Sequence, residues 1–536
     1  MISAALIAQY GVGIAVSALA AACAFAFAVR SGRTVSRGFL VGAIAVVPVF
    51  LVIAQLLKYA SLHMYVDLAH WLRLFRSIVE TGVPTVMNQA FIVSGTAHYF
   101  SVHFVPLVYA LAVPFALVPR AEMLLVVNVL LMASAAVPLA LLAKHRTGDG
   151  RFALLIAALF LWYPTFQYTT LYEFEMLRLS IPALCWMLYA WERRRMTLVY
   201  LFAVLAVLVR EEVGLTVGMF GVLLLVQRHY RHGIVLALGG FGAFGIITSV
   251  LMPMFRSGSY EHVALGAFGA LGRTPLAVLI GMVTHPLRAM AIALHPEKLA
   301  NLVMYGVPLL GIPLLAPAAL LPTLPSVAIA LLSASRTHSS YFLYYLSPAI
   351  PFIFWAFVCA WPRVIVIAEH RARGAYGADT VIHARGAIMV AVIVGMLGAQ
   401  VFFGPSPLAL QFWDTRFRPA PFRTQSFHWS AYHTDADQDA LAAVIAVIPR
   451  DAIVSTQQYL MPRLAHGGGA MAYPQLESVD GTARAAFVLL DDTNHDLQSD
   501  SPAYVDAAML DIVRQDRVHW ERIAAQSSYA LYRFRP

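Results

Sequence analysis

The feature that most constrains this chain is a series of long apolar runs almost without charge. A helix needs about 20 apolar residues to cross the hydrocarbon core of a bilayer. Only 12% of the 536 residues are charged, roughly half the share found in soluble globular proteins. We therefore expect a mostly α-helical, polytopic membrane protein, a bundle of about 11–13 membrane helices. The candidate spans are residues 5–29, 39–57, 122–143, 152–169, 178–191, 233–252, 299–315, 317–333, 341–361 and 387–403.

Two further apolar segments fit this pattern less simply. Residues 104–118 are short for a span and contain Pro106 and Pro114, so we predict a partial or surface-lying helix there. A full hairpin is the alternative, and it would invert the loop that follows. Residues 197–227 are interrupted by Arg210-Glu211-Glu212, which predicts two shorter helices with the charges between them.

Arginine is concentrated in short loops between the apolar runs, which is the charge bias of cytoplasmic loops. This bias places residues 58–103 and 404–536 outside the cytoplasm. It also accounts for the net charge of +9, and no basic stripe with interleaved aromatics indicates binding of nucleic acid. We expect membrane lipids as partners. The arginines that form the pattern are Arg30, Arg33, Arg37, Arg193, Arg194, Arg195, Arg228, Arg231, Arg371 and Arg373.

The composition changes after residue 403, and two domains are predicted. Residues 1–403 form the transmembrane domain. Residues 404–536 are polar and mixed, with a helix-like run at 439–448 and strand-like runs at 485–490 and 528–534. About 130 residues is an ordinary size for one domain, so we expect a small soluble α/β domain on the outer side.

An amphipathic stretch at residues 64–82 follows the second span and carries the leading candidate residue, Asp67. Such a helix lies along the membrane surface with its apolar face buried. An acid held there can act as a general base with a pKa tuned by partial burial, and His70 one turn on could orient or share the proton. The alternative is that Asp67 is an ordinary solvated acid on the surface. The predicted apolar face comprises Leu68, Trp71, Leu72, Phe75, Ile78 and Val79, and the polar face Asp67, His70, Ser77 and Glu80.

Other candidate residues lie at the ends of apolar runs. Glu173 and Glu175 follow a predicted span, and their carboxylates suit sugar hydroxyls or a divalent ion; exposed loop acids are the alternative. Charges within an apolar run are costly and are usually functional or paired. Arg210 could therefore clamp a phosphate, or Arg210 and Glu211 could simply satisfy each other.

Two residues at the entrances of apolar segments complete the candidate site, namely His103 and Tyr345. Aromatic side chains are enriched at both membrane interfaces, and interfacial histidines are often structural. For each of them, one interpretation is a structural role at the membrane interface, and the more specific one is a place in the functional site.

Short motifs follow one another in a fixed order from about residue 60 to the C-terminus. They are Asp67-Leu68-Ala69, His103-Phe104-Val105-Pro106, Tyr172-Glu173-Phe174-Glu175, Arg210-Glu211-Glu212, the segment from His338 to Tyr345, and Ile448-Pro449-Arg450-Asp451-Ala452. In this order they resemble a bacterial family of predicted membrane proteins of unknown function. That family is itself similar to the GT-C glycosyltransferases. The chain departs from the family pattern at Val105, Glu175 and Arg210, where the family has serine, histidine and lysine.

The resemblance implies an activity and a location. Enzymes of the wider superfamily take a sugar from a polyprenyl-phosphate donor and transfer it to a lipid, glycan or protein acceptor, on the outer side of the bacterial inner membrane. Their base is an acid of the first outer loop, which corresponds to Asp67, and a second acid corresponds to Glu173. Substrate contacts would then involve His70, His103, Glu175, Arg210, Glu211 and Tyr345. Some members use a divalent metal, Mg²⁺ or Mn²⁺, and others do not.

Two other function classes remain open. A non-enzymatic lipid-glycan transporter should have inverted repeats and broken helices that meet at the midplane, and the sequence offers one broken segment, 197–227, without a matching partner. An envelope assembly scaffold would recruit partners through residues 404–536. For a scaffold, the acids would be dispensable and the outer domain would not.

Overall fold

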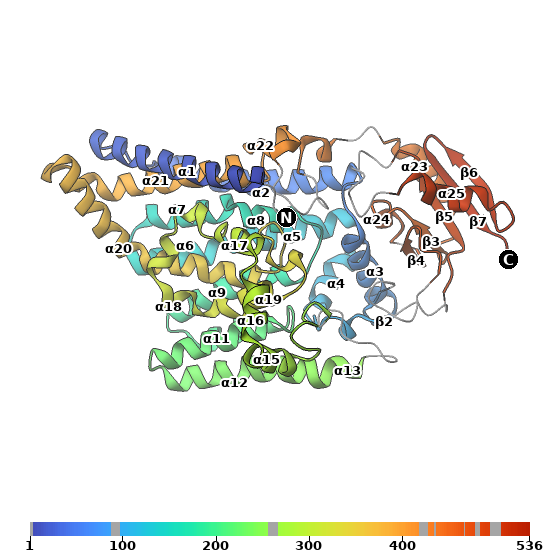
Figure 1. The fold of residues 1–536 in the computed structure, drawn as a ribbon, viewed down its shortest axis with the longest axis horizontal. Coiled ribbons are helices and arrows are strands. Elements are labelled where there is room, and N and C mark those ends of the chain that lie inside the picture. The colour runs from blue at the N-terminus through green and yellow to red at the C-terminus, as the bar shows by residue number, and fades with distance from the viewer. Residues whose placement is uncertain are drawn as a thin grey trace.

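The computed structural model combines a helical bundle with a small β-sheet unit at one end (Figure 1). It describes residues 4–86, 97–255, 266–417, 427–433, 436–465, 467–477, 483–493 and 505–536. The bundle helices run along the long axis of the molecule, and the sheet unit lies beyond their ends (Figure 1). The expected class, a mostly helical membrane bundle with a C-terminal α/β part, is confirmed.

Six helices among the described residues are long and apolar enough to cross a membrane, judged by length and composition. They comprise α1 (Ala4–Ser31), α2 (Arg37–Ala60), α5–α6 (Ala121–Ser134 and Ala136–Thr147), α12–α13 (Tyr230–Ile246 and Met252–Met254), α20 (Ile350–Tyr376) and α21 (Ala384–Phe403). Within the bundle, α1 packs against α21, and α2 packs against α5 and α7.

The other helices of the bundle are shorter or bent. In two pairs the bend falls just before a proline, which cannot continue the hydrogen-bond pattern of the preceding helix. The pair α7–α8 (Gly150–Trp162, Pro164–Leu171) is bent by 49°, and α15–α16 (Pro275–Thr284, Pro286–Ala293) by 104°. The remaining helices are α9 (Ser180–Glu192), α10 (Met196–Val207), α11 (Val213–Val226), α17 (Pro296–Val303), α18 (Pro317–Leu320) and α19 (Leu324–Leu332).

Between α17 and α19 the sequence prediction was wrong. The expected span at 299–315 is replaced by α17 and 3-10 turns, and the run at 317–333 forms a helical segment, Pro317–Leu332, that is shorter than a span. Prolines recur through this segment, at Pro308, Pro313, Pro317, Pro322 and Pro325, and each removes a backbone donor from any continuous helix. The later run 341–361 also begins its helix only at Ile350.

Residues 104–118 form a partial helix, as predicted. Helix α4 (Val108–Leu117) has 10 residues, which is about 15 Å and half the thickness of a bilayer core. It packs against α3 (Val66–Thr81), beside the short hairpin of β1 (Thr85–Val86) and β2 (Ala97–His98). The predicted break at Arg210 is also present, between α10 and α11.

The two ends of the bundle differ in charge. The arginine-bearing connections α1–α2, α6–α7, α11–α12 and α20–α21 lie at the end farthest from the sheet unit (Figure 1). Ion pairs join neighbouring elements there, with Arg146 Nη1 at 2.6 Å from Glu192 and Arg385 Nη2 at 2.9 Å from Asp149. We call this the basic end and the other the site end. That the site end faces outward stays a prediction.

The C-terminal sheet has five strands in the order β4-β3-β5-β7-β6. Strands β4, β3 and β5 are parallel, and β7 pairs antiparallel with both β5 and β6. The runs expected at 439–448, 485–490 and 528–534 are confirmed as α23, β5 and β7. The bounds are α22 (Leu410–Trp413), α23 (Gln438–Ala446), β3 (Ile453–Thr456), α24 (Met461–Leu464), β4 (Gly469–Ala472), β5 (Phe487–Asp491), α25 (Ala507–Gln515), β6 (Trp520–Gln526) and β7 (Tyr529–Phe534).

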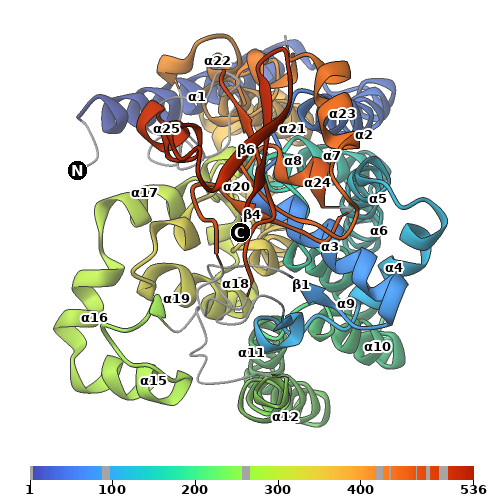
Figure 2. The ribbon, with the colours of Figure 1, turned by 90° about the vertical axis from the view of Figure 1, so that its right-hand side faces the viewer.

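The sheet unit is attached to the bundle through α3 and the end of α2. Helix α24 packs on α3, and Figure 2 shows α3 and α24 together beneath the sheet. The Arg463 guanidinium donates to Tyr59 O at 3.1 Å, and Arg73 donates to Gly467 O at 3.0 Å. The unit therefore lies directly over the helix that carries Asp67. The division at residue 403 stays a prediction.

Candidate functional site

Helix α3 presents Asp67 in its first turn, where a carboxylate interacts favourably with the helix dipole. The predicted apolar face is confirmed from Leu68 to Ile78. Two assignments were wrong: Val79 is 47% exposed, and Ser77 is buried with its hydroxyl bonded to Val83 O. Asp67 itself is half-buried.

The loop between α8 and α9 crosses the start of α3 and contacts it through successive side chains. The Tyr172 hydroxyl donates to Asp67 Oδ2 at 2.5 Å. The Leu68 N–H donates to Glu173 Oε2 at 2.8 Å, so Glu173 satisfies a backbone donor that a helix start leaves unpaired. The Phe174 ring packs on Trp71 with centroids 5.4 Å apart. This loop therefore fixes the position of the start of α3.

Asp67 and Glu173 form a closely coupled pair of acids. Burial raises the pKa of Asp67, and the hydrogen bond from Tyr172 offsets part of that rise. The pKa of Glu173 is also raised, first by burial and then by the charge of Asp67, while the Leu68 N–H and Lys58 act in the opposite direction. Two nearby carboxylates disfavour the doubly charged state. The pair is therefore suited to holding one proton near neutral pH.

The two acids differ in access. Glu173 is 2% exposed and is engaged by the α3 backbone. Asp67 is half-buried, and its Oδ1 accepts no hydrogen bond from any residue that the structure describes. Asp67 is thus the member of the pair whose oxygen an incoming hydroxyl can reach.

A second cluster forms around Arg210, between α10 and α11. The guanidinium donates through Nη2 to His103 Nε2 at 2.8 Å, and its Nη1 lies 3.4 Å from Glu175 Oε1. Glu212 Oε2 lies 3.3 Å from Arg210 Nε. Three neighbours thus surround a cation that is 5% exposed, and their carboxylates outweigh the effect of burial and raise the pKa of Arg210.

His103 and Glu211 extend this cluster toward α4. Since arginine can only donate, His103 Nε2 must accept, and the proton of a neutral ring then lies on Nδ1. The Nδ1–H faces Glu211 Oε1 at 2.8 Å, and the Phe104 N–H donates to Glu211 Oε2 at 2.9 Å. Burial would raise the pKa of Glu211, but His103 and Arg210 outweigh it and lower the pKa to about 2. Glu211 is therefore a permanent carboxylate.

The structure brings most of the predicted site residues together at the site end. Glu173 and Glu175, two positions apart, link the Asp67 pair to the Arg210 cluster. The partly exposed Tyr345 joins them through Tyr344, whose ring centroid lies 5.3 Å from that of Tyr172. His70 lies on α3 one turn after Asp67, and burial lowers its pKa to about 4. His70 is therefore neutral at physiological pH.

Four neighbours of the site were missed by sequence reasoning: Lys58, Tyr99, Tyr172 and Arg178. Arg178 is fully buried and donates through Nε to Glu175 O at 3.1 Å. Lys58 is also fully buried, and it donates to Leu171 O. A basic residue in the last turn of an apolar helix is normally interfacial, so no pattern in the sequence indicates that Lys58 is enclosed beside Glu173.

Side chains able to bind a metal ion are not clustered in the described part of the site. Within the described residues, no group of three or more His, Cys, Asp or Glu side chains is arranged to hold a metal ion. The Glu175 carboxylate is paired with Arg210, and the Glu211 carboxylate is paired with His103.

Comparisons with known proteins agree with the expected family. The sequence profile of a family described as predicted membrane protein (DUF2079) matches residues 15–516. No curated protein matches the sequence significantly. Several solved structures are also similar to this chain, at low sequence identity.

Two of these solved structures illustrate the similarity. ArnT from Cupriavidus metallidurans bound to undecaprenyl phosphate is 12% identical with a TM-score of 0.48, and the match covers 93% of this chain and 98% of ArnT. The Archaeoglobus fulgidus oligosaccharyltransferase is 15% identical with a TM-score of 0.40, covering 82% of this chain and 67% of that one.

Proposed function

This chain belongs to the DUF2079 family of predicted membrane proteins, and we propose that it is a membrane glycosyltransferase in which Asp67 is the general base. The donor would be a sugar linked to polyprenyl phosphate, and the acceptor a hydroxyl of a lipid, glycan or protein. The reaction would take place at the site end, on the outer side of the inner membrane.

The observation that carries this proposal is the unequal access of the two coupled acids. Asp67 Oδ2 is held by the Tyr172 hydroxyl, whereas Oδ1 has no partner among the described residues. A general base must be within reach of the proton it removes and must have a pKa near the working pH. Burial raises the pKa of Asp67 toward that range. Asp67 would take the proton of the acceptor hydroxyl. The oxygen of that hydroxyl would attack the anomeric carbon, and polyprenyl phosphate would leave.

The other residues would position the reactants. Glu173 would hold the start of α3 in place and, with its pKa raised to about 8, would carry the proton of the pair so that Asp67 stays ionised. Arg210, enclosed by His103, Glu175 and Glu212, would fix the inner wall of the site, and contact with the lipid phosphate would require it to leave one of these partners. His70, Glu211 and Tyr345 would line the substrate side.

The direct test is transfer by the purified protein in liposomes with a panel of polyprenyl-phosphate sugars. We expect Asp67→Asn to slow the release of polyprenyl phosphate by about 10²–10⁴-fold, the usual contribution of a general base. Glu80→Gln is the matched control, since Glu80 lies on the same helix in an exposed pair with Arg76. Equal rates for the two variants would rule out Asp67 as the base.

The same liposomes separate the rival functions. A transporter would move a labelled lipid-linked sugar across the bilayer without cleaving it, and Asp67→Asn need not affect that movement. A scaffold would tolerate loss of Asp67 and Glu173 and would fail when residues 404–536 are removed.

A further inference from the structure

A long apolar groove runs along α20 on the side that faces α1. Its volume is about 1300 Å³, which exceeds the range of about 300–1,000 Å³ of ordinary small-molecule sites. The floor is α20, from Ala349 to Tyr376, and the walls are α1 and the proline-rich segment from Leu302 to Val327. In the view of Figure 2, α20 lies between α1 and α18.

Four of the six α1 residues that line the groove are small, and the other two are Ile14 and Phe25. Ser17, Ala18, Ala21 and Ala22 line the groove at helical spacing, so α1 leaves room for a chain between itself and α20. The opposite wall is irregular because 3-10 turns replace a continuous helix there. The missing span described above thus creates the groove.

One end of the groove carries positive charge. Arg371 lines it, together with Tyr376, and the Arg30 guanidinium lies over the Tyr376 ring at 5.0 Å. Neither arginine forms an ion pair with any residue in the described part of the chain. Both belong to the basic end, since α20 finishes at the end of the bundle farthest from the sheet unit (Figure 1).

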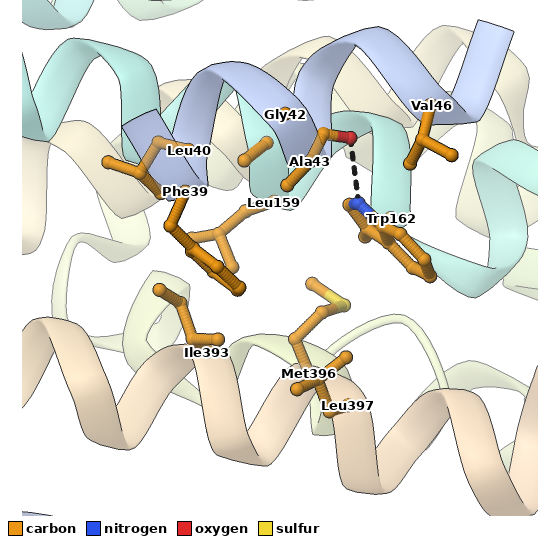
Figure 3. Close-up of a pocket in the computed structure, with 11 residues that line it drawn as sticks. Phe39, Leu40, Gly42, Ala43, Val46, Leu159, Trp162, Ile393, Met396 and Leu397 are labelled. Atoms are coloured by element: carbon orange, nitrogen blue, oxygen red, sulfur yellow. Dashed lines mark hydrogen bonds between the residues drawn. The ribbon is translucent and has the colours of Figure 1, made fainter. Parts of the chain in front are cut away.

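A smaller groove provides a comparison. It lies between α2, α7 and α21, has a volume of about 460 Å³, and is lined by apolar side chains, with the Trp162 ring N–H donating to Ala43 O at 3.0 Å (Figure 3). Among the described residues, none that lines it is charged. It suits a loosely held lipid tail but has nothing to recognise a headgroup.

We propose that the α20 groove binds one anionic phospholipid of the leaflet at the basic end, with its phosphate at Arg371 and Arg30 and an acyl chain along α1 and α20. Guanidinium groups bind phosphate oxygens in pairs and attract anionic lipids. Bulk lipid offers an acyl chain equally apolar surroundings. The groove would therefore hold the chain in preference to bulk lipid only where its walls fit the shape of the chain. This site is separate from the proposed transferase site and does not depend on it.

The role of the Arg371 charge in lipid binding is tested by native mass spectrometry of the full-length protein with added phosphatidylglycerol or phosphatidylcholine. We expect wild-type protein to retain one phosphatidylglycerol, and Arg371→Gln to bind it about ten-fold more weakly, the loss of one charge-assisted contact. Arg373→Gln is the matched control, because Arg373 is exposed on the same helix and does not line the groove. Phosphatidylcholine should bind wild-type protein more weakly than phosphatidylglycerol, because its choline cation offsets the charge of its phosphate.

The groove is tested by filling it. Ala22→Trp should abolish retention of phosphatidylglycerol, whereas Leu19→Trp, on the outward face of α1, should leave it unchanged. Equal binding by Arg371→Gln and Arg373→Gln, or by the two tryptophan variants, would overturn the proposal. So would displacement of phosphatidylglycerol by undecaprenyl phosphate with an affinity that Arg371→Gln does not change, because the groove would then hold a polyprenyl chain.

Discussion

At the scale of single residues, the contact between Tyr172 and Asp67 leads to a prediction about pH. The hydroxyl stabilises the carboxylate and so lowers the pKa of Asp67 from the value that burial alone would give. Tyr172→Phe removes this donor, and the pKa of Asp67 should rise further. A base acts only when deprotonated, so activity should fall on the acid side and the midpoint of that fall should move to higher pH.

The measurement is a pH profile of sugar transfer for wild type and Tyr172→Phe. We expect the acid midpoint to shift upward by about one pH unit, the equivalent of one hydrogen bond to a charged group. Tyr345→Phe is the control, since the Tyr345 hydroxyl contacts Tyr344 and not Asp67. A lower maximal rate with an unchanged midpoint would show that Tyr172 has only a structural role.

The sequence could identify these residues but not their partners. Asp67, Glu173 and Arg210 stand out because acids and arginines are rare among apolar runs. Their partners are 105 and 107 residues away along the chain for Tyr172–Asp67 and Arg210–His103, and no local pattern encodes such pairs. The prediction that Arg210 meets a phosphate could not allow for carboxylates that approach it from other elements.

At the scale of elements, Glu173 holds the first turn of α3. Glu173→Ala should free the Leu68 N–H and loosen residues 66–70, at a cost of about 1–2 kcal/mol, as for a lost helix cap. Glu173→Gln keeps an acceptor oxygen and should leave the helix start in place. Hydrogen exchange measured by mass spectrometry reads this directly. Faster exchange in both variants would mean that the charge, and not the hydrogen bond, positions α3.

The helices themselves were predicted well where an apolar run has at most one internal proline and poorly where prolines recur every few residues. Runs 39–57 and 387–403 became α2 and α21 nearly as expected. Hydrophobicity is equally high between residues 299 and 333, because a broken segment enclosed in a membrane protein needs the same apolar surface as a span. Pro308 and Pro313 indicated the break in the helix, but a count of apolar residues takes no account of proline.

At the scale of the whole molecule, the sheet unit covers the helix that carries the proposed base. The contacts are of two kinds. The Arg463 guanidinium lies over the Tyr59 ring at 4.2 Å and donates to Tyr59 O, and Arg73 donates to Gly467 O. Apolar side chains of the unit, including Leu460, Met461 and Leu464, belong to the same hydrophobic core as α3. A cation–aromatic contact and a hydrogen bond are each worth about 1 kcal/mol, so loss of the two arginines should loosen this interface without separating the unit from the bundle.

We predict that Arg73→Ala with Arg463→Ala loosens the interface between the sheet unit and the bundle while each part stays folded. Cryo-EM maps should keep the bundle sharp and show weaker density for the sheet, and hydrogen exchange should rise in α3 and α24 but not in β5. Arg484→Ala is the control, since it removes an ion pair with Glu477 inside the unit. If transfer falls only in the double variant, the position of the sheet over α3 matters for the reaction; unchanged transfer together with faster exchange at the interface would show that it does not.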